Sequence, residues 1–220
     1  MRNKPVIGFI GLGLMGHGMA KNILEGGYEL WVRGRSNRTP IEDLVSMGAK
    51  EAINPKQLAE VCDIIHICLS NAPQIEVIMR SQYGILAGAK PGLIVVDTST
   101  SDPDMTKQLA AQLRAKGGHF VDAPMAGTPA KAEAGQLSTM LGCDRDVLPH
   151  IRPVISCWAE TITRIGETGE GHKMKLLTNF INLSYADLFS EATSLGAKVG
   201  IAPEKLREVI SSSHIGQQVL

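Results

Sequence analysis

Three glycines near the start of the chain have the spacing of a phosphate-binding turn. Gly11, Gly13 and Gly16 follow the apolar run 6–10 in the pattern G-x-G-x-x-G. In such turns the first glycine permits a tight bend, the second lets the backbone approach a pyrophosphate, and the third lets the next helix pack closely on the strand. The free N–H groups at the start of that helix attract phosphate oxygens. The pattern predicts a dinucleotide site with contacts at Gly11, Gly13, Leu14, Met15 and Gly16.

The segment after the second predicted strand suits a phosphate group better than a hydroxyl. In dinucleotide folds a carboxylate at this point binds the ribose 2′-hydroxyl of NAD, whereas arginine accepts the 2′-phosphate of NADP. This chain has Gly34 where the acid would stand, surrounded by Arg33, Arg35, Ser36 and Arg38. A solvated basic loop is the alternative interpretation. In a chain of balanced charge the local cluster favours NADP over NAD, with Arg35 and Ser36 as phosphate contacts.

Strand-like and helical segments alternate over the region that must position these residues. Strand-like runs lie at 6–10, 29–33, 64–69, 93–97, 120–122, 137–141 and 161–165. This alternation predicts an α/β fold, a Rossmann-type doubly wound and mostly parallel sheet of about seven or eight strands with helices on both faces. We expect this layer to end near Gly166.

Capping side chains mark three predicted helix starts. Asn54 and Asp102 each precede a proline, which suits the first position of a helix. Asp144 is a third candidate and precedes the segment 145–155. Two prolines inside that segment predict a short or broken helix.

The pattern becomes purely helical after Thr168. Apolar residues recur at helical spacing from Leu176 to Leu195, which predicts one helix of about 40 Å, followed by a second from Pro203 to about Ser212. We therefore expect an NADP-binding Rossmann-like domain at 1–165, and at 166–220 a long interdomain helix with the beginning of an all-α second domain. Because two helices do not enclose a core of their own, we expect a truncated chain or a homo-oligomer formed through the helical domain.

Composition argues against several functional classes. The 220 residues include 22 basic and 22 acidic ones, so no bulk charge favours nucleic acid or an anionic membrane. No run approaches the roughly 18 apolar residues of a membrane span. The four cysteines form no C-x-x-C pair and have no histidine at ligand spacing, which indicates reduced thiols rather than a metal site or disulfides. We predict a soluble, cytoplasmic protein without a metal.

Three longer motifs occur in order along the chain. They are G-F-I-G-L-G-L-M-G at 8–16, D-A-P-M-A-G-T-P-A-K-A-E-A-G at 122–135 and G-E-T-G-E-G-H-K-M-K-L-L-T-N at 166–179. These motifs resemble the glycine turn, the substrate loop and the catalytic helix of the β-hydroxyacid dehydrogenase family. That family includes 3-hydroxyisobutyrate dehydrogenase, tartronate semialdehyde reductase and, more distantly, 6-phosphogluconate dehydrogenase. The resemblance covers essentially the whole chain.

The resemblance implies an enzyme that transfers hydride between a nicotinamide and a small acid. It makes Lys175 the counterpart of the family's catalytic lysine, the general acid and base, and Asn179 that of its substrate-orienting asparagine. Residues four apart lie on one helical face, so both side chains can point at one small ligand. The remaining implied contacts are Leu69, Ser70, Ser99 and Thr100 for the cofactor, and Ala126, Gly127, Thr128 and Asn179 for the substrate.

Two departures from the family pattern leave the substrate open. Ala126 and Thr128 stand where the family has Ser and Gly, so the usual serine hydroxyl for a substrate carboxylate is missing. The Thr128 hydroxyl, or the backbone N–H groups of Gly127 and Thr128, can replace it. The family's later K-D-x-x-x-A segment also has no match in this chain.

We therefore expect NADP-dependent interconversion of a short 3-hydroxy acid, or a related primary alcohol, and its semialdehyde. An imine reductase-like enzyme and a non-catalytic dinucleotide-binding module of the same fold are the alternatives. Lys175 argues against both, because such proteins tend to lack this lysine. We interpret His17 and His172 as structural or solvent-facing rather than catalytic.

Overall fold

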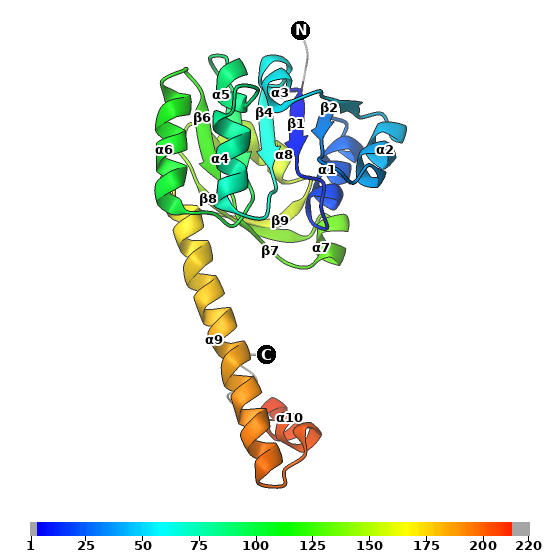
Figure 1. Cartoon of the computed structure of the whole chain (residues 1–220), viewed down its shortest axis with the longest axis vertical. Coiled ribbons are helices and arrows are strands. Elements are labelled where there is room, and N and C mark those ends of the chain that lie inside the picture. Colours follow the sequence, from blue (N-terminus) through cyan, green and yellow to red (C-terminus); the bar gives the residue numbers. More distant parts are fainter. Residues whose placement is uncertain (1–3, 213–220) are drawn as a thin grey trace. The chain divides into compact units, whose positions relative to one another are not determined.

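The computed structural model describes residues 4–212 of the chain. The chain divides into two compact units between Lys175 and Leu176, within the long helix α9 (Glu170–Lys198). The first unit is a layered α/β structure, and the second is helical (Figure 1).

The first unit is built on a nine-stranded, mostly parallel sheet. Its strands are β1 (Ile7–Ile10), β2 (Leu30–Arg33), β3 (Lys50–Glu51), β4 (Ile64–Ile67), β5 (Ile94–Asp97), β6 (His119–Asp122), β7 (Met125–Ala126), β8 (Leu137–Gly142) and β9 (Ala159–Gly166). The order is β3-β2-β1-β4-β5-β6-β8-β7, and β9 pairs with β8. All neighbours from β3 to β6 are parallel, while β8 is antiparallel to β6 and β7. Because the strand order reverses between β1 and β4, ligands are expected at the carboxyl ends of these strands.

The predicted fold class is confirmed. The seven predicted strands are β1, β2, β4, β5, β6, β8 and β9. The sequence does not predict β3 or β7, because two residues carry no visible alternation of apolar and polar side chains. β3 nevertheless carries an acidic residue, Glu51, beside the arginines at the end of β2 and after it.

One face of the sheet is covered by α1 (Gly16–Glu25), α2 (Thr39–Ser46) and α8 (Leu148–Ile155). Their buried side chains join Phe9, Val96 and Trp158 in one apolar core. The short helix α7 (Pro129–Glu133) lies beside α1. This face therefore includes the helix that follows the glycine turn.

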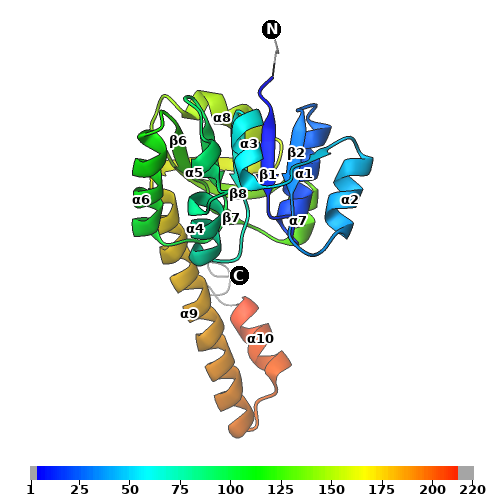
Figure 2. The same ribbon diagram turned by 45° about the horizontal axis from the view of Figure 1, so that its top comes forward.

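The opposite face is covered by α3 (Pro55–Val61), α4 (Ala72–Arg80), α5 (Ile85–Gly88) and α6 (Pro103–Arg114), as the two ribbon views show (Figure 1, Figure 2). A second apolar core between these helices and the sheet contains Ile10, Ile65 and Val95. Alternate residues of each central strand thus enter different cores, which holds the sheet between two packed layers.

Two of the three predicted helix caps are confirmed. Asn54 Oδ1 accepts from the N–H of Gln57 at 2.9 Å, and Asp102 Oδ1 accepts from the N–H of Asp104 at 2.8 Å. The prediction for Asp144 is wrong, because α8 begins only at Leu148. Pro149 lacks an N–H and suits the first turn of that helix. The carboxylate of Asp144 instead accepts from Arg114 at 3.0 Å.

The second unit contains the rest of α9 and the helix α10 (Pro203–Ser212), so both predicted helices are confirmed. Large apolar side chains of α9 are exposed, namely Leu176, Leu177, Phe180, Ile181, Leu183, Tyr185, Leu188 and Leu195. Exposed apolar surface of this extent is typical of an interaction surface. Within residues 4–212 no helix has the length and apolar character needed to cross a membrane.

His66 of β4 is a polar residue inside the first core. It is fully buried, and neither ring nitrogen has a hydrogen-bond partner. Its ring stacks on Phe9 with the centroids 5.7 Å apart and meets Trp158 edge-on at 6.1 Å. Burial lowers the pKa of His66 to about 3, so the neutral ring packs as an apolar group.

The substitution His66→Leu should therefore make the protein less sensitive to acid. His66 takes up a proton near pH 6.5 in the unfolded chain but only near pH 3 in the fold, so its contribution to stability is present above pH 6.5 and is lost as pH falls through that window. Relative to the variant, the wild type should lose about 2 kcal/mol of unfolding free energy between neutral pH and pH 5. Urea unfolding of both proteins at the two pH values measures this difference. A stability difference that stays constant with pH would contradict the assignment.

Candidate cofactor and active site

The glycine turn joins β1 to α1, and other backbone atoms pack closely against Gly11 and Gly16. Gly11 has a φ of +96°, and a Cβ atom there would lie 2.1 Å from the carbonyl oxygen of Cys68. A Cβ atom at Gly16 would lie 1.9 Å from the carbonyl oxygen of Gly11. A Cβ atom at Gly13 would instead meet no atom within 4 Å. The turn is thus open at Gly13, which fits the close approach of a pyrophosphate to the backbone.

The side chains that follow this turn differ in burial. Leu14 is exposed, whereas Met15 is half-buried against the first core. Both residues directly precede α1, and Met15 is its N-cap residue. Their contact with a cofactor stays a prediction.

The segments after β4 and β5 lie side by side, because these strands are parallel neighbours. The N–H of Leu69 donates to Ser99 Oγ at 2.9 Å, which joins the two segments. Ser70 and Thr100 are exposed at the same edge. Ser99 itself is buried, and its N–H donates to Asp97 Oδ1 at 3.0 Å. The structure therefore brings these four predicted residues together, with Ser99 linking the two loops.

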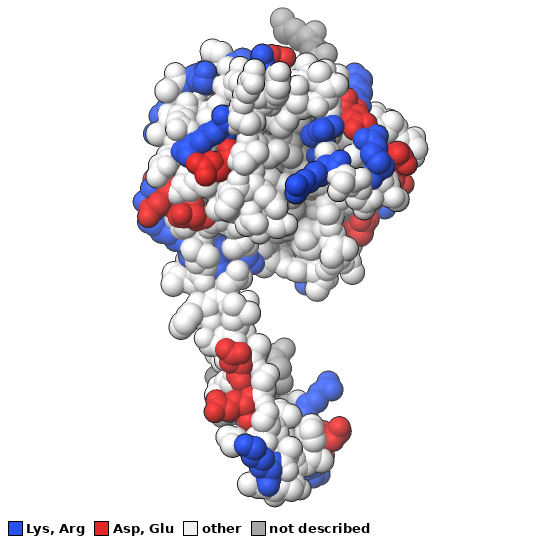
Figure 3. All heavy atoms as spheres, viewed as in Figure 1, with Lys and Arg blue, Asp and Glu red and all other residues white. Residues whose placement is uncertain are grey.

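The three arginines after β2 have different surroundings. Arg38 donates to both carboxylate oxygens of Glu51, at 2.7 and 2.9 Å, and Arg33 lies 3.7 Å from the same carboxylate. The hydrogen bond from Arg38 lowers the pKa of Glu51. Arg35 is exposed and forms no ion pair with any residue in the described part of the chain. Basic and acidic side chains are seen together over β2 and α2 in Figure 3. Arg35, next to the exposed Ser36, is thus the arginine left available to an added anion.

The predicted substrate loop follows β6 and includes β7. Ala126 ends β7, and Thr128 caps α7 by accepting from the N–H of Lys131 at 3.3 Å. The cap uses the oxygen of the Thr128 hydroxyl and leaves its proton available to a ligand. Thr128 can therefore cap the helix and donate a hydrogen bond at the same time.

The helix α9 carries both residues implied for catalysis. Lys175 is half-buried in the first unit, and desolvation lowers its pKa. A lowered pKa is what a lysine needs to release and take up a proton near neutral pH. Asn179, also half-buried, follows four residues later on the same helix and belongs to the second unit.

The first turn of α9 is held by Asp122, which is not among the site residues expected from the sequence. Its carboxylate accepts from the N–H of Gly169 at 2.6 Å and from the N–H of His172 at 2.8 Å. Burial raises the pKa of Asp122, while His172 and these N–H groups oppose the shift. The sequence feature that marks Asp122 is its position as the first residue of the D-A-P motif, at the carboxyl end of a predicted strand.

The two histidines interpreted as structural differ in surroundings. His17 on α1 lies near the surface, with its ring nitrogens 2.8 Å from Asp43 and 3.1 Å from Glu133. His172 is fully buried at the start of α9. His17 therefore connects three helices, whereas His172 is buried in contact with α6 and with the loop after β5.

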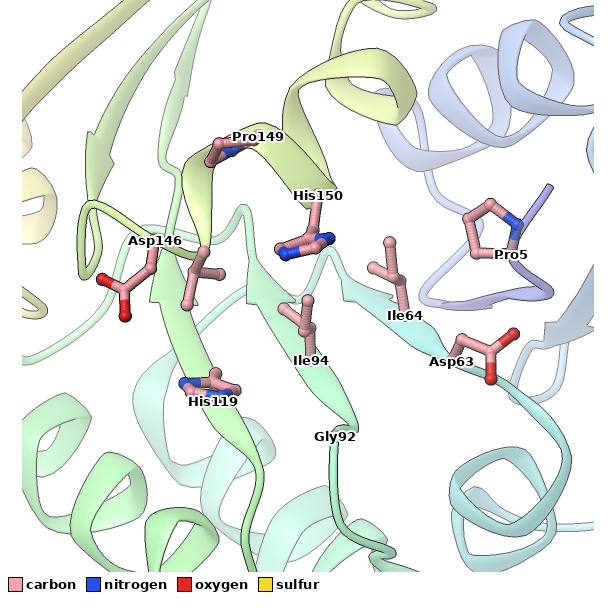
Figure 4. Close-up of a pocket in the computed structure, with 10 residues that line it drawn as sticks. Pro5, Asp63, Ile64, Gly92, Ile94, His119, Asp146, Pro149 and His150 are labelled. Carbon is pink, nitrogen blue, oxygen red and sulfur yellow. The ribbon is translucent and has the colours of Figure 1, made fainter. Parts of the chain in front are cut away.

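A cavity of about 660 Å³ lies at the amino ends of the strands, on the side of the sheet opposite to their carboxyl ends (Figure 4). It is found where β4, β5 and β6 begin and is lined by Ile64, Ile94 and His119 of these strands and by His150 of α8. The predicted cofactor loops follow the carboxyl ends of the strands. The cavity is therefore separate from the candidate site, and it contains none of the predicted site residues.

Comparison with known proteins agrees with these observations. Residues 6–166 match the family described as the NAD binding domain of 6-phosphogluconate dehydrogenase. The chain is 36% identical over 213 residues to 2-(hydroxymethyl)glutarate dehydrogenase from Eubacterium barkeri, a match that covers 97% of this chain and 70% of the relative. It is 32% identical over 215 residues to 2-hydroxy-3-oxopropionate reductase from Escherichia coli, with 97% and 73% covered.

Solved structures share this architecture. Psf3 in complex with NADP+ and 2-OPP aligns with a TM-score of 0.84 at 27% identity, covering 96% of this chain and 74% of that one. An imine reductase from Pseudomonas sp., at 19% identity, shares the fold alone. Because the family match spans most of the chain and relatives above 30% identity align with nearly all of it, the chain belongs to the β-hydroxyacid dehydrogenase family.

Proposed function

We propose that the protein is an NADP-dependent oxidoreductase that interconverts a short 3-hydroxy acid, or a related primary alcohol, and its semialdehyde. The observation that carries the proposal is the half-buried Lys175, whose pKa is lowered by desolvation, on a helix anchored at the carboxyl end of the sheet. The names of the relatives support the substrate class, since one is a hydroxymethyl acid dehydrogenase and another an oxo acid reductase.

The cofactor would be held by the glycine turn and by the loops after β4 and β5. The open backbone at Gly13 fits the pyrophosphate, and the exposed Ser70 and Thr100 are available to the nicotinamide half. Arg35 and Ser36 would bind the 2′-phosphate by charge-assisted and neutral hydrogen bonds. When bound, the nicotinamide supplies or accepts the hydride.

Lys175 would move the proton that accompanies hydride transfer. In the reducing direction its ammonium group protonates the alkoxide oxygen as it forms, and in the oxidising direction the neutral amine removes the hydroxyl proton. Asn179, on the same helix, would orient the substrate oxygen. The N–H groups of Gly127 and Thr128 and the Thr128 hydroxyl would bind the substrate's acid group beside Ala126.

We further propose that residues 1–165 act as the NADP-binding domain and that residues 166–220 begin an all-α domain. The exposed apolar side chains of α9 support a homo-oligomer formed through this second part. An imine reductase-like enzyme or a non-catalytic module stays the alternative, and retention of Lys175 favours the dehydrogenase.

Arg35→Ala should weaken NADPH binding without changing NADH binding. Loss of a hydrogen bond to a charged phosphate reduces affinity roughly ten- to hundredfold. Arg38→Ala is the matched control, because the Arg38 guanidinium is already paired with Glu51 and its loss should cost less. Titration of each protein with NADPH and with NADH by fluorescence measures the effect. Equal affinity of the wild type for the two cofactors would contradict the 2′-phosphate assignment.

Lys175→Ala should abolish most turnover while NADPH still binds. Removal of a positioned general acid lowers kcat by about 100- to 10,000-fold. Lys173→Ala, at an exposed lysine two residues earlier, is the matched control and should keep kcat. The substrate is first identified by an NADPH-linked screen of small semialdehydes and hydroxy acids. Turnover retained by Lys175→Ala would rule out its role as the proton donor.

Leu188→Glu should reduce the molecular mass in solution if α9 forms the interface between copies. The substitution puts a charge on a 60% exposed apolar residue. Ser190→Glu, at an exposed polar position on the same helix, should leave the mass unchanged. Light scattering after size exclusion gives the mass of each protein. A wild type that elutes with the mass of one 23.6 kDa chain would exclude the oligomer.

A further inference from the structure

The buried side chain of His172 connects three elements of the first unit. It extends from the first turn of α9, and its Nδ1 lies 2.8 Å from Thr106 Oγ1 on α6. Its Nε2 lies 3.2 Å from the carbonyl oxygen of Ser99, in the loop after β5. Lys175 follows three residues later on the same helix. One imidazole therefore joins the first turn of α9, which precedes the turn of Lys175, to α6 and to a predicted cofactor loop.

The hydrogen-bond partners determine how the ring is protonated. A carbonyl oxygen only accepts, so Nε2 must carry the proton that is donated to Ser99. Burial lowers the pKa of His172, although Asp122 opposes the shift, so the neutral ring is favoured. Its Nδ1 then faces the Thr106 hydroxyl, whose single proton can go to Nδ1 or to the carbonyl oxygen of Asp102, which lies 2.9 Å from Thr106 Oγ1. The carboxylates that face this ring are Asp97, with Oδ2 at 3.9 Å, Asp122 and Asp102. Nε2 thus faces Ser99 and Nδ1 faces Thr106.

The contact with Ser99 extends to the second cofactor loop. The Ser99 hydroxyl accepts from the N–H of Leu69, and its own N–H donates to Asp97. The backbone of His172 is held separately by Asp122. The first turn of α9 is therefore attached through backbone N–H groups to β6, and through the imidazole to α6 and to the loop after β5.

We infer that His172 is a positioning residue that holds Lys175 in register with the cofactor loops through its hydrogen bond to Ser99. This inference rests on the proposed role of Lys175. Asp122 fixes where α9 begins from β6, whereas the imidazole of His172 contacts the Ser99 loop directly. Through this contact, a ligand that orders Ser99 and Thr100 also fixes the position of Lys175.

The test compares His172→Leu with His172→Gln. Leucine fills the space without hydrogen bonds, whereas the glutamine amide can donate to Ser99 and accept from Thr106. His172→Leu should lower kcat roughly ten- to hundredfold, as expected when a catalytic group is misplaced. It should also shift the limb of the pH profile of kcat/KM that reports the protonation of Lys175. His172→Gln should restore most of kcat and the original limb. A kcat for His172→Leu equal to that of the wild type would overturn the inference.

Thr106→Val separates this link from simple packing. It removes the Thr106 hydrogen bonds to His172 and to the carbonyl oxygen of Asp102 but leaves the hydrogen bond from His172 to Ser99, so kcat should stay close to the wild-type value. A loss as large as that of His172→Leu would show that packing against α6, and not the link to Ser99, positions Lys175. Thermal unfolding of all three variants reports any general loss of stability.

Hydrogen exchange of the ligand-free protein tests the link without activity. His172→Leu should speed amide exchange at residues 69–70 and 98–101, and His172→Gln should not. Unchanged exchange in His172→Leu would show that no such link exists, whatever the enzyme's chemistry. Absence of NADPH binding or turnover in the wild type would instead contradict the proposed function, so the two failures are distinguishable.

Discussion

The buried carboxylate of Asp122 accepts hydrogen bonds from two backbone N–H groups at the start of α9. Removing these bonds would leave a charged group and two polar groups without partners in a region from which water is excluded. The pair of bonds therefore defines where the long helix leaves the sheet. Because Lys175 lies in the next turn of that helix, its relation to the carboxyl ends of β5 and β6 depends on this attachment.

The doubly wound topology explains why so many predicted residues gather at one edge. Neighbouring parallel strands present their carboxyl ends together, so loops that are distant in the sequence can bond directly. The contact between Leu69 and Ser99 crosses 30 residues, and that between Ser99 and His172 crosses 73. The glycine turn closes the same edge through the close approach of Gly11 to Cys68. The result is a set of loops joined to one another as well as to the sheet.

The arginines at the end of β2 and after it are partly neutralised by an acidic residue of β3, a strand that the sequence did not predict. Glu51 on β3 binds Arg38 and lies near Arg33, and it thereby neutralises part of the basic cluster. Arg35 is exposed and forms no ion pair within residues 4–212. The cavity at the amino ends of the strands, with His119 and His150, lies apart from this arrangement.

The sequence by itself determined seven of the nine strands of the sheet, the glycine turn, the caps at Asn54 and Asp102, and the family. These features depend on local periodicity, on backbone sterics and on motif spacing, which are all visible along the chain. Only the tertiary structure decided that Asp144 pairs with Arg114 instead of capping α8, that Glu51 pairs with Arg38 and not with Arg35, and that His172 reaches Ser99. The physical reason is that these contacts join segments far apart in the sequence, and strand register and side-chain direction set their partners.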